Sequence, residues 1–184
     1  MPNEMPTPKD VAAPRVRSVA TSQRLSYHFG SKEGLERAVA DRLQLEIIAP
    51  KRDLPWQDRL IGMANAYRGI AKRYSNAFPL LLRFWTTGPS DLKIAEEWHQ
   101  ALFDAGLPEK EIPALGFAIY AAILGVCAGE IGGLLDKPSA EELDDIKRKT
   151  DLPLTKKLLP ILSRLRGEEV FEAAIANMLS GIAA

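Results

Sequence analysis

The chain has 184 residues, of which 46% are hydrophobic, and 24 basic residues balance 24 acidic ones. This length and apolar content predict one main domain with a small appendage, and zero net charge excludes a surface devoted entirely to nucleic acid. The sequence shows no signal peptide, no apolar run of the roughly 18 residues that span a bilayer and only one cysteine, Cys127, so we expect a cytoplasmic protein.

The first 30 residues carry a small excess of positive charge, four basic side chains against two acidic ones. This excess of positive charge is compatible with binding to DNA phosphates, and equally with a solvent-exposed tail. Residues 1–14 contain four prolines, each of which would remove a hydrogen bond from a helix and clash with its preceding turn. We therefore expect no helix over residues 1–14.

Residues 25–35, Leu-Ser-Tyr-His-Phe-Gly-Ser-Lys-Glu-Gly-Leu, have the pattern of a helix end, a tight turn and a new helix. Gly30 supplies the permissive turn, and Ser31 is a favoured N-cap residue. Tyr27 and Phe29 are placed to pack a small domain. Polar side chains between them point outward.

This stretch resembles the end of the DNA-binding domain in the TetR family of bacterial repressors, which reads close to LYYHFGSKEGL. The resemblance implies an all-α fold, with a helix-turn-helix head in residues 1–30 and a helical ligand-binding and dimerisation domain in residues 31–184. It also implies operator DNA and a small apolar or aromatic effector as partners. The family's DNA-contacting positions fall on Thr21, Ser22, Gln23, Arg24, Ser26, Tyr27, His28 and Lys32.

The head departs from the family pattern at several points. Family members carry a first helix beneath the recognition helix, and the prolines of residues 1–14 leave no room for one. Val19 stands where the turn usually has glycine, and Ser26 where a phosphate-binding tyrosine is common. We therefore expect a truncated DNA-binding domain that binds its operator weakly. The alternative is a dimeric small-molecule-binding protein without operator binding.

From Ser31 onward, apolar residues at helical spacing predict successive helices, with proline and glycine at the joints. The expected segments are Ser31 to Ile48, Pro55 to Tyr74, a short apolar piece from Phe78 to Trp85, Ser90 or Asp91 to Gly106, Glu109 to Leu135, Ser139 to Lys149, Pro153 to Leu165, and Glu168 to Ile182. No convincing stretch alternates with period two. The sequence alone thus predicts an all-α fold.

The helices at 109–135 and 168–182 are apolar over more than one stripe, and small residues along both allow close helix approach. We expect them to form the four-helix bundle of a homodimer, with a tightly packed monomer core as the alternative. The end of the chain, Phe171 to Ile175 and Leu179 to Ile182, also resembles the close of regulators with a C-terminal domain of the tetracycline-repressor type.

Aromatic side chains on helices that should face each other predict an effector pocket, although such residues also commonly fill cores. They are Tyr67, Phe78, Trp85, Trp98, Phe103, Phe117 and Tyr120. The candidate polar groups are His99, Arg83 and Glu130. Because Glu130 lies in an apolar helix, it must find a partner or shift its pKa, and it faces either the ligand or the dimer partner.

The sequence gives no support for catalysis. Glu96 and His99 have the spacing of a di-iron helical site, but such a site needs a second copy, and the other histidine is the distant His28. Cys127 has no histidine near it in sequence and suits a structural thiol. Phosphate-cradling and dinucleotide-binding glycine motifs are absent. We expect neither an enzyme nor a bound cofactor or metal.

Overall fold

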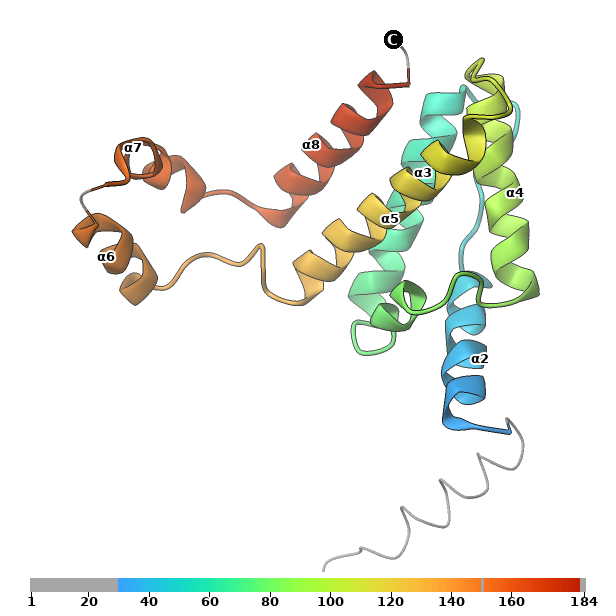
Figure 1. Cartoon of the computed structure of the whole chain (residues 1–184), viewed down its shortest axis with the longest axis horizontal. Coiled ribbons are helices and arrows are strands. Elements are labelled where there is room, and N and C mark those ends of the chain that lie inside the picture. The colour runs from blue at the N-terminus through green and yellow to red at the C-terminus, as the bar shows by residue number, and fades with distance from the viewer. Residues whose placement is uncertain (1–29, 150, 183–184) are drawn as a thin grey trace, which may run out of the picture. The chain divides into compact units, whose positions relative to one another are not determined.

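The computed structural model describes residues 30–149 and 151–182, and all regular structure within them is helical (Figure 1). This confirms the all-α prediction. The elements are α2 (Lys32–Gln44), α3 (Trp56–Arg73), the 3-10 helix η1 (Phe78–Leu82), α4 (Pro89–Asp104), α5 (Ile112–Ile131), α6 (Ala140–Arg148), α7 (Pro153–Leu162) and α8 (Gly167–Ser180). The chain divides into two units, Met1–Glu36 and Arg37–Ala184.

Most of the predicted DNA-contacting positions lie outside the described residues: Thr21, Ser22, Gln23, Arg24, Ser26, Tyr27 and His28. Lys32, in the first turn of α2, is exposed, and its Nζ lies 3.7 Å from Glu36 Oε1. Ser31 Oγ accepts a hydrogen bond from the Gly34 amide at 2.9 Å, which confirms Ser31 as the N-cap. Gly30 has a φ of 70°, the left-handed conformation that glycine adopts without strain.

The helix α2 ends at Gln44, four residues before the expected Ile48. The chain continues there in tighter i→i+3 turns, in which the amides of Glu46 and Ile47 bond to the carbonyls of Leu43 and Gln44. Such turns commonly close an α-helix. Gln44 is therefore the last helical residue of α2, a position that matters for the site described below.

Helices α3, α4 and α5 pack against one another, and α8 lies along α5 and contacts α3 (Figure 1). The apolar face predicted for α3 is confirmed, since its members at helical spacing are all buried: Leu60, Met63, Ala64, Tyr67, Ile70 and Ala71. Phe78 and Leu81 of η1 join the same core. Fully burying a side chain of this kind contributes about 1.5–3 kcal/mol, so the α3 stripe alone holds much of the domain together.

The helix α5 is long and apolar enough in composition to cross a membrane, with Glu130 as its one charged side chain in 20 residues. The expectation that no apolar run reaches this length is therefore wrong for α5. The core helix of a globular domain passes the same test, because burial against protein also selects apolar residues. Its contacts with α3, α4 and α8 are those of such a core helix.

Helices α6 and α7 contact each other. The predicted capping box of α6 is confirmed, since the Glu142 amide donates to Ser139 Oγ at 3.2 Å and the Ser139 amide donates to Glu142 Oε2 at 2.7 Å. Hydrogen bonds from the Ser139 backbone and side chain lower the pKa of the Glu142 carboxyl. Pro160 lies inside α7, whose predicted range it interrupts.

Candidate effector pocket and its links to α2

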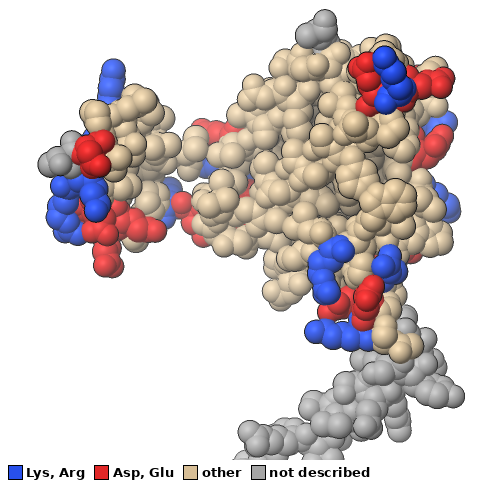
Figure 2. Space-filling model, viewed as in Figure 1, with Lys and Arg blue, Asp and Glu red and all other residues tan. Residues whose placement is uncertain are grey.

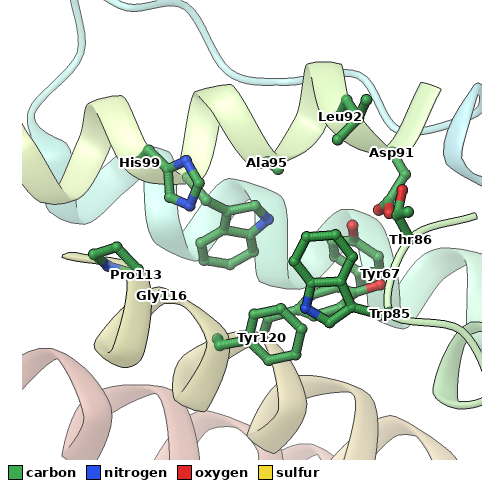
Figure 3. Close-up of a pocket in the computed structure, with 12 residues that line it drawn as sticks. Tyr67, Trp85, Thr86, Asp91, Leu92, Ala95, His99, Pro113, Gly116 and Tyr120 are labelled. Carbon is green, nitrogen blue, oxygen red and sulfur yellow. The ribbon is translucent and has the colours of Figure 1, made fainter. Parts of the chain in front are cut away.

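A cavity of about 220 Å³ lies among α3, α4, α5 and the segment between η1 and α4 (Figure 3). The residues that line it are Tyr67, Trp85, Thr86, Asp91, Leu92, Ala95, Trp98, His99, Pro113, Gly116, Phe117 and Tyr120. Thr86 and Asp91 lie at one end, and His99 and Pro113 at the other. An apolar cleft with a few placed polar groups is the usual form of a small-molecule site.

Aromatic rings form most of the walls. Tyr67 and Tyr120 meet edge to face, with ring centroids 5.4 Å apart and an interplanar angle of 69°. Trp85 stacks on Phe117 at 6.5 Å and 15°, yet Trp85 is 80% exposed. The exposed stacked pair places a flat aromatic surface between the cavity and solvent.

Six of the predicted pocket residues come together around this cavity: Tyr67, Trp85, Trp98, His99, Phe117 and Tyr120. Four predicted residues lie elsewhere. Phe78 is completely buried in the core, and Phe103, in the last turn of α4, is 52% exposed. The predicted polar candidate Arg83 is exposed and does not line the cavity either.

The fourth, Glu130, is bound within its own protomer. Arg68 Nε and Nη2 donate to its two carboxylate oxygens at 2.8 and 2.7 Å, and Lys72 Nζ lies 3.2 Å away. The Arg68 hydrogen bonds lower the pKa of the Glu130 carboxyl. Glu130 thus finds the partner that its apolar helix requires, but the partner is on α3 and neither a ligand nor a second protomer is needed.

The sequence interpretation missed several lining residues: Thr86, Leu92, Ala95, Pro113 and Gly116. Leu92 and Ala95 share helical spacing with His99, so the face of α4 that carries this histidine could have identified them. Asp91 was considered only as a helix cap. Thr86 lies in a non-helical segment, for which spacing gives no information.

The buried amide of Gln44, 1% exposed, joins α2 to the cavity wall. Its Nε2 donates to Asp91 Oδ1 at 2.9 Å and to the Tyr120 hydroxyl at 3.2 Å, and the Tyr67 hydroxyl donates to its Oε1 at 2.8 Å. Burial raises the pKa of Tyr67 well above its usual range and that of Tyr120 to about 12, so both phenols are neutral at physiological pH.

Two further α2 residues, one and two turns before Gln44, hold the same segment. Asp41 Oδ1 accepts from the Ser90 amide and Oδ2 from the Ser90 hydroxyl, both at 3.0 Å. Arg37 Nη1 donates to the Thr86 carbonyl at 2.5 Å. Positions 37, 41 and 44 share one helix face, so three successive turns of α2 contact residues 86–91.

The start of α4 differs from the prediction that Ser90 or Asp91 would be its N-cap. The N-cap is Gly88, which has no side chain to cap with. The Asp41 carboxylate of α2 instead satisfies the Ser90 amide, one of the free N–H groups at this end. Asp91 Oδ2 accepts from the Thr87 amide just before the helix, at 3.1 Å.

Cys127 is completely buried in α5, and burial raises the pKa of its thiol to about 12. The thiol is therefore un-ionised at neutral pH, which agrees with its interpretation as a structural residue.

The larger unit matches a known sequence family, described as the tetracyclin repressor-like C-terminal domain, over residues 49–184. The chain belongs to the TetR family of transcriptional regulators. The match confirms the family and includes residues 171–182, whereas residues 25–35 lie outside it. A search of curated proteins gave no significant match.

Solved structures share the family fold with this chain. A structural-genomics protein from Streptomyces coelicolor A3(2) superposes with a TM-score of 0.74 at 24% identity, over 94% of this chain and 87% of that one. Apo ActR from Streptomyces coelicolor gives 0.77 at 16% identity, over 91% and 85%. BioQ from Mycobacterium smegmatis gives 0.67 at 19% identity, over 91% and 82%.

Proposed function

We propose that this TetR-family chain is a ligand-responsive, DNA-binding transcriptional regulator, a cytoplasmic repressor that a small molecule releases from its operator. The observation that carries the proposal is the attachment of Arg37, Asp41 and Gln44 to residues 86–91, which include part of the cavity wall. The helix that bears these three residues follows directly, in sequence, on the segment that resembles a DNA-recognition helix.

Residues 86–91 lie between the cavity and α2 and are hydrogen-bonded to α2 at three positions. Thr86 and Asp91 line the cavity directly, so a ligand that shifts either of them acts on hydrogen bonds made by α2. Gln44 also bonds to Tyr67 on α3 and Tyr120 on α5, which line the cavity as well. We expect the ligand to bind more tightly to one of two positions of α2, which is what a ligand-driven change of state requires.

We infer a homodimer from the surface of α5 and α8, whose face in Figure 2 is largely uncharged. The exposed residues there include several small ones: Ala118, Ala121, Ala122 and Gly125 on α5, and Ala173 and Ala176 on α8. Small side chains allow two helix pairs to approach closely, and exposed uncharged faces of this kind commonly mark protein interfaces. The solved complex of ActR with (S)-DNPA supports the expectation of a small-molecule effector in this fold.

Selection from a random pool of DNA duplexes tests the DNA-binding part of the proposal. A repressor enriches one operator, and we expect Arg24→Ala to reduce discrimination between sequences. Lys32→Ala should weaken binding to all sequences alike and flatten the salt dependence by about one unit. Addition of a cavity ligand should then release the enriched operator.

The same experiment distinguishes the proposed regulator from the alternative function. If no sequence is enriched while aromatic ligands still raise the melting temperature, the chain is a dimeric small-molecule-binding protein without operator binding. The four prolines of residues 1–14, which disfavour a helix there, are the feature that favours this alternative.

A further inference from the structure

We propose that the cavity takes an uncharged, planar aromatic molecule whose carbonyl oxygen accepts a hydrogen bond from an unpaired donor of the lining residues, the Trp98 indole N–H or the Thr86 hydroxyl. This inference rests on the proposed function only in treating the cavity as the effector site. The chemistry of that effector follows from three properties of the cavity walls: their shape, their unpaired hydrogen-bond donors and their charge.

The shape favours fused aromatic rings. The cavity holds about 220 Å³, whereas an apolar cavity of roughly 150 Å³ already accepts benzene. Tyr67, Trp98 and Tyr120 form its inner walls, and the flat stacked pair of Trp85 and Phe117 lies toward solvent. A planar ligand of two or so rings makes stacked or edge contacts with all of these surfaces.

Two unused donors in the walls call for an acceptor on the ligand. Trp98 is 4% exposed, and its indole Nε1 is buried without a hydrogen-bond partner among the described residues. The same holds for the hydroxyl of Thr86. An indole N–H can only donate, so a partner for Trp98 must bring an acceptor oxygen or nitrogen. A buried donor without a hydrogen-bond partner raises the free energy of the folded protein, and a ligand carbonyl that accepts its hydrogen bond would remove this penalty.

The charge of the walls disfavours an acid. Asp91 is the one Asp, Glu, Lys or Arg among the described lining residues, so the described walls hold no Lys or Arg to pair with a ligand carboxylate, and His99 is their one basic side chain. The Asp91 oxygens already accept hydrogen bonds from Gln44 and the Thr87 amide. This carboxylate therefore has partners within the protein and does not require a cationic ligand. His99 lies at the other end of the cavity from Asp91 (Figure 3).

Three matched probes test the inference on the full chain by isothermal titration calorimetry. Methyl naphthyl ketone carries the acceptor, isopropenylnaphthalene replaces its carbonyl oxygen by CH₂ at nearly the same shape, and naphthoate carries a charge. We expect the ketone to bind about tenfold more tightly than the hydrocarbon, the gain typical of one or two hydrogen bonds. Naphthoate should bind at least about tenfold more weakly than the ketone.

Variants assign the effect to the two donors. Trp98→Phe and Thr86→Val each remove a donor with little change of shape, and either should lower the preference for the ketone over the hydrocarbon. Together they should reduce it to less than about twofold. Trp56→Phe, the same change at a tryptophan that does not line the cavity, should leave the preference unchanged. Thr86→Val keeps the test decisive if the Trp98 variant does not fold.

Equal binding of ketone and hydrocarbon overturns the inference, as does tighter binding of naphthoate or of a naphthylmethylammonium cation. Failure of all naphthyl probes to bind overturns it as well. The proposed function fails separately: it does so if the ketone binds as expected but neither it nor any other cavity ligand releases DNA. If other molecules release DNA while the ketone does not bind, the function stands and the ligand chemistry is wrong.

Discussion

Gln44 Nε2 lies 2.9 Å from Asp91 Oδ1, which joins the last residue of α2 to the wall of the cavity through one buried hydrogen bond. The same amide group also reaches Tyr120, and its oxygen accepts from Tyr67. A single side chain therefore connects three cavity residues, on α3, α4 and α5, to α2.

Gln44→Leu should lower the free energy of unfolding by about 2 kcal/mol, because it removes the hydrogen bonds of this buried amide with Asp91, Tyr67 and Tyr120. Urea unfolding followed by circular dichroism measures this. Gln100→Leu is the control, since Gln100 Nε2 also bonds to a carboxylate, that of Asp104, at 2.9 Å but on the exposed surface. Its cost should stay within about 0.5 kcal/mol. Equal costs would show that the buried network contributes nothing beyond a surface contact.

The contact between Asp41 and the start of α4 predicts a non-additive pair of mutations. Asp41→Ala removes the group that satisfies the Ser90 amide and should cost about 1 kcal/mol, as the loss of a helix cap does. Gly88→Ala should also destabilise, because its new Cβ would lie 2.7 Å from Asp41 Oδ1. In the double variant this clash is gone, so the combined cost should be smaller than the sum. Strict additivity in urea melts would contradict the contact.

The ion pair of Glu130 and Arg68 predicts a pH dependence of stability. Arg68 lowers the pKa of Glu130 below its ordinary value of 4.5, so the folded state binds this proton less readily than the unfolded chain. The pair's stabilisation is complete above about pH 4.5 and is lost as the pH falls through the lower folded pKa.

Glu130→Gln should therefore lower the free energy of unfolding by about 2 kcal/mol at pH 7. This loss is somewhat smaller than for a fully buried pair, because Arg68 still has the Glu168 carboxylate 3.9 Å away. The difference between wild type and variant should shrink below pH 4.5, which unfolding curves at pH 7 and pH 3 measure. Asp144→Asn, which breaks an exposed pair with Lys147, should change stability little at either pH. A Glu130→Gln difference that grows toward low pH would reverse the assigned sign.

Dimerisation predicts a variant that separates association from folding. Ala121 is exposed on α5 in the protomer, so Ala121→Glu leaves the protomer core intact but places a charge in the proposed interface. Sedimentation should show a shift from dimer to monomer with unchanged helical content. Ala140→Glu, at an exposed position in the first turn of α6, is the matched control and should remain a dimer. Persistence of the dimer in the Ala121 variant would exclude this face of α5.

The sequence by itself determined the helices and the family. Periodic apolar residues on α3, the capping box of Ser139 and Glu142, and the motif at residues 25–35 are local features, and local spacing is sufficient to recognise them. It also identified half of the cavity lining, because aromatic residues on packed helices have few places other than a core or a pocket.

The tertiary structure decided what those residues touch. Glu130 was expected to face a ligand or a second protomer, and it pairs with Arg68, 62 residues away in sequence. The cap of α4 comes from Asp41 on α2, and Gln44, which no sequence pattern singled out, joins α2 to the cavity. Each of these contacts links helices distant in the chain. A polar side chain shows by its type that it needs a partner when buried, but only the packing of the helices determines which partner lies within hydrogen-bonding distance.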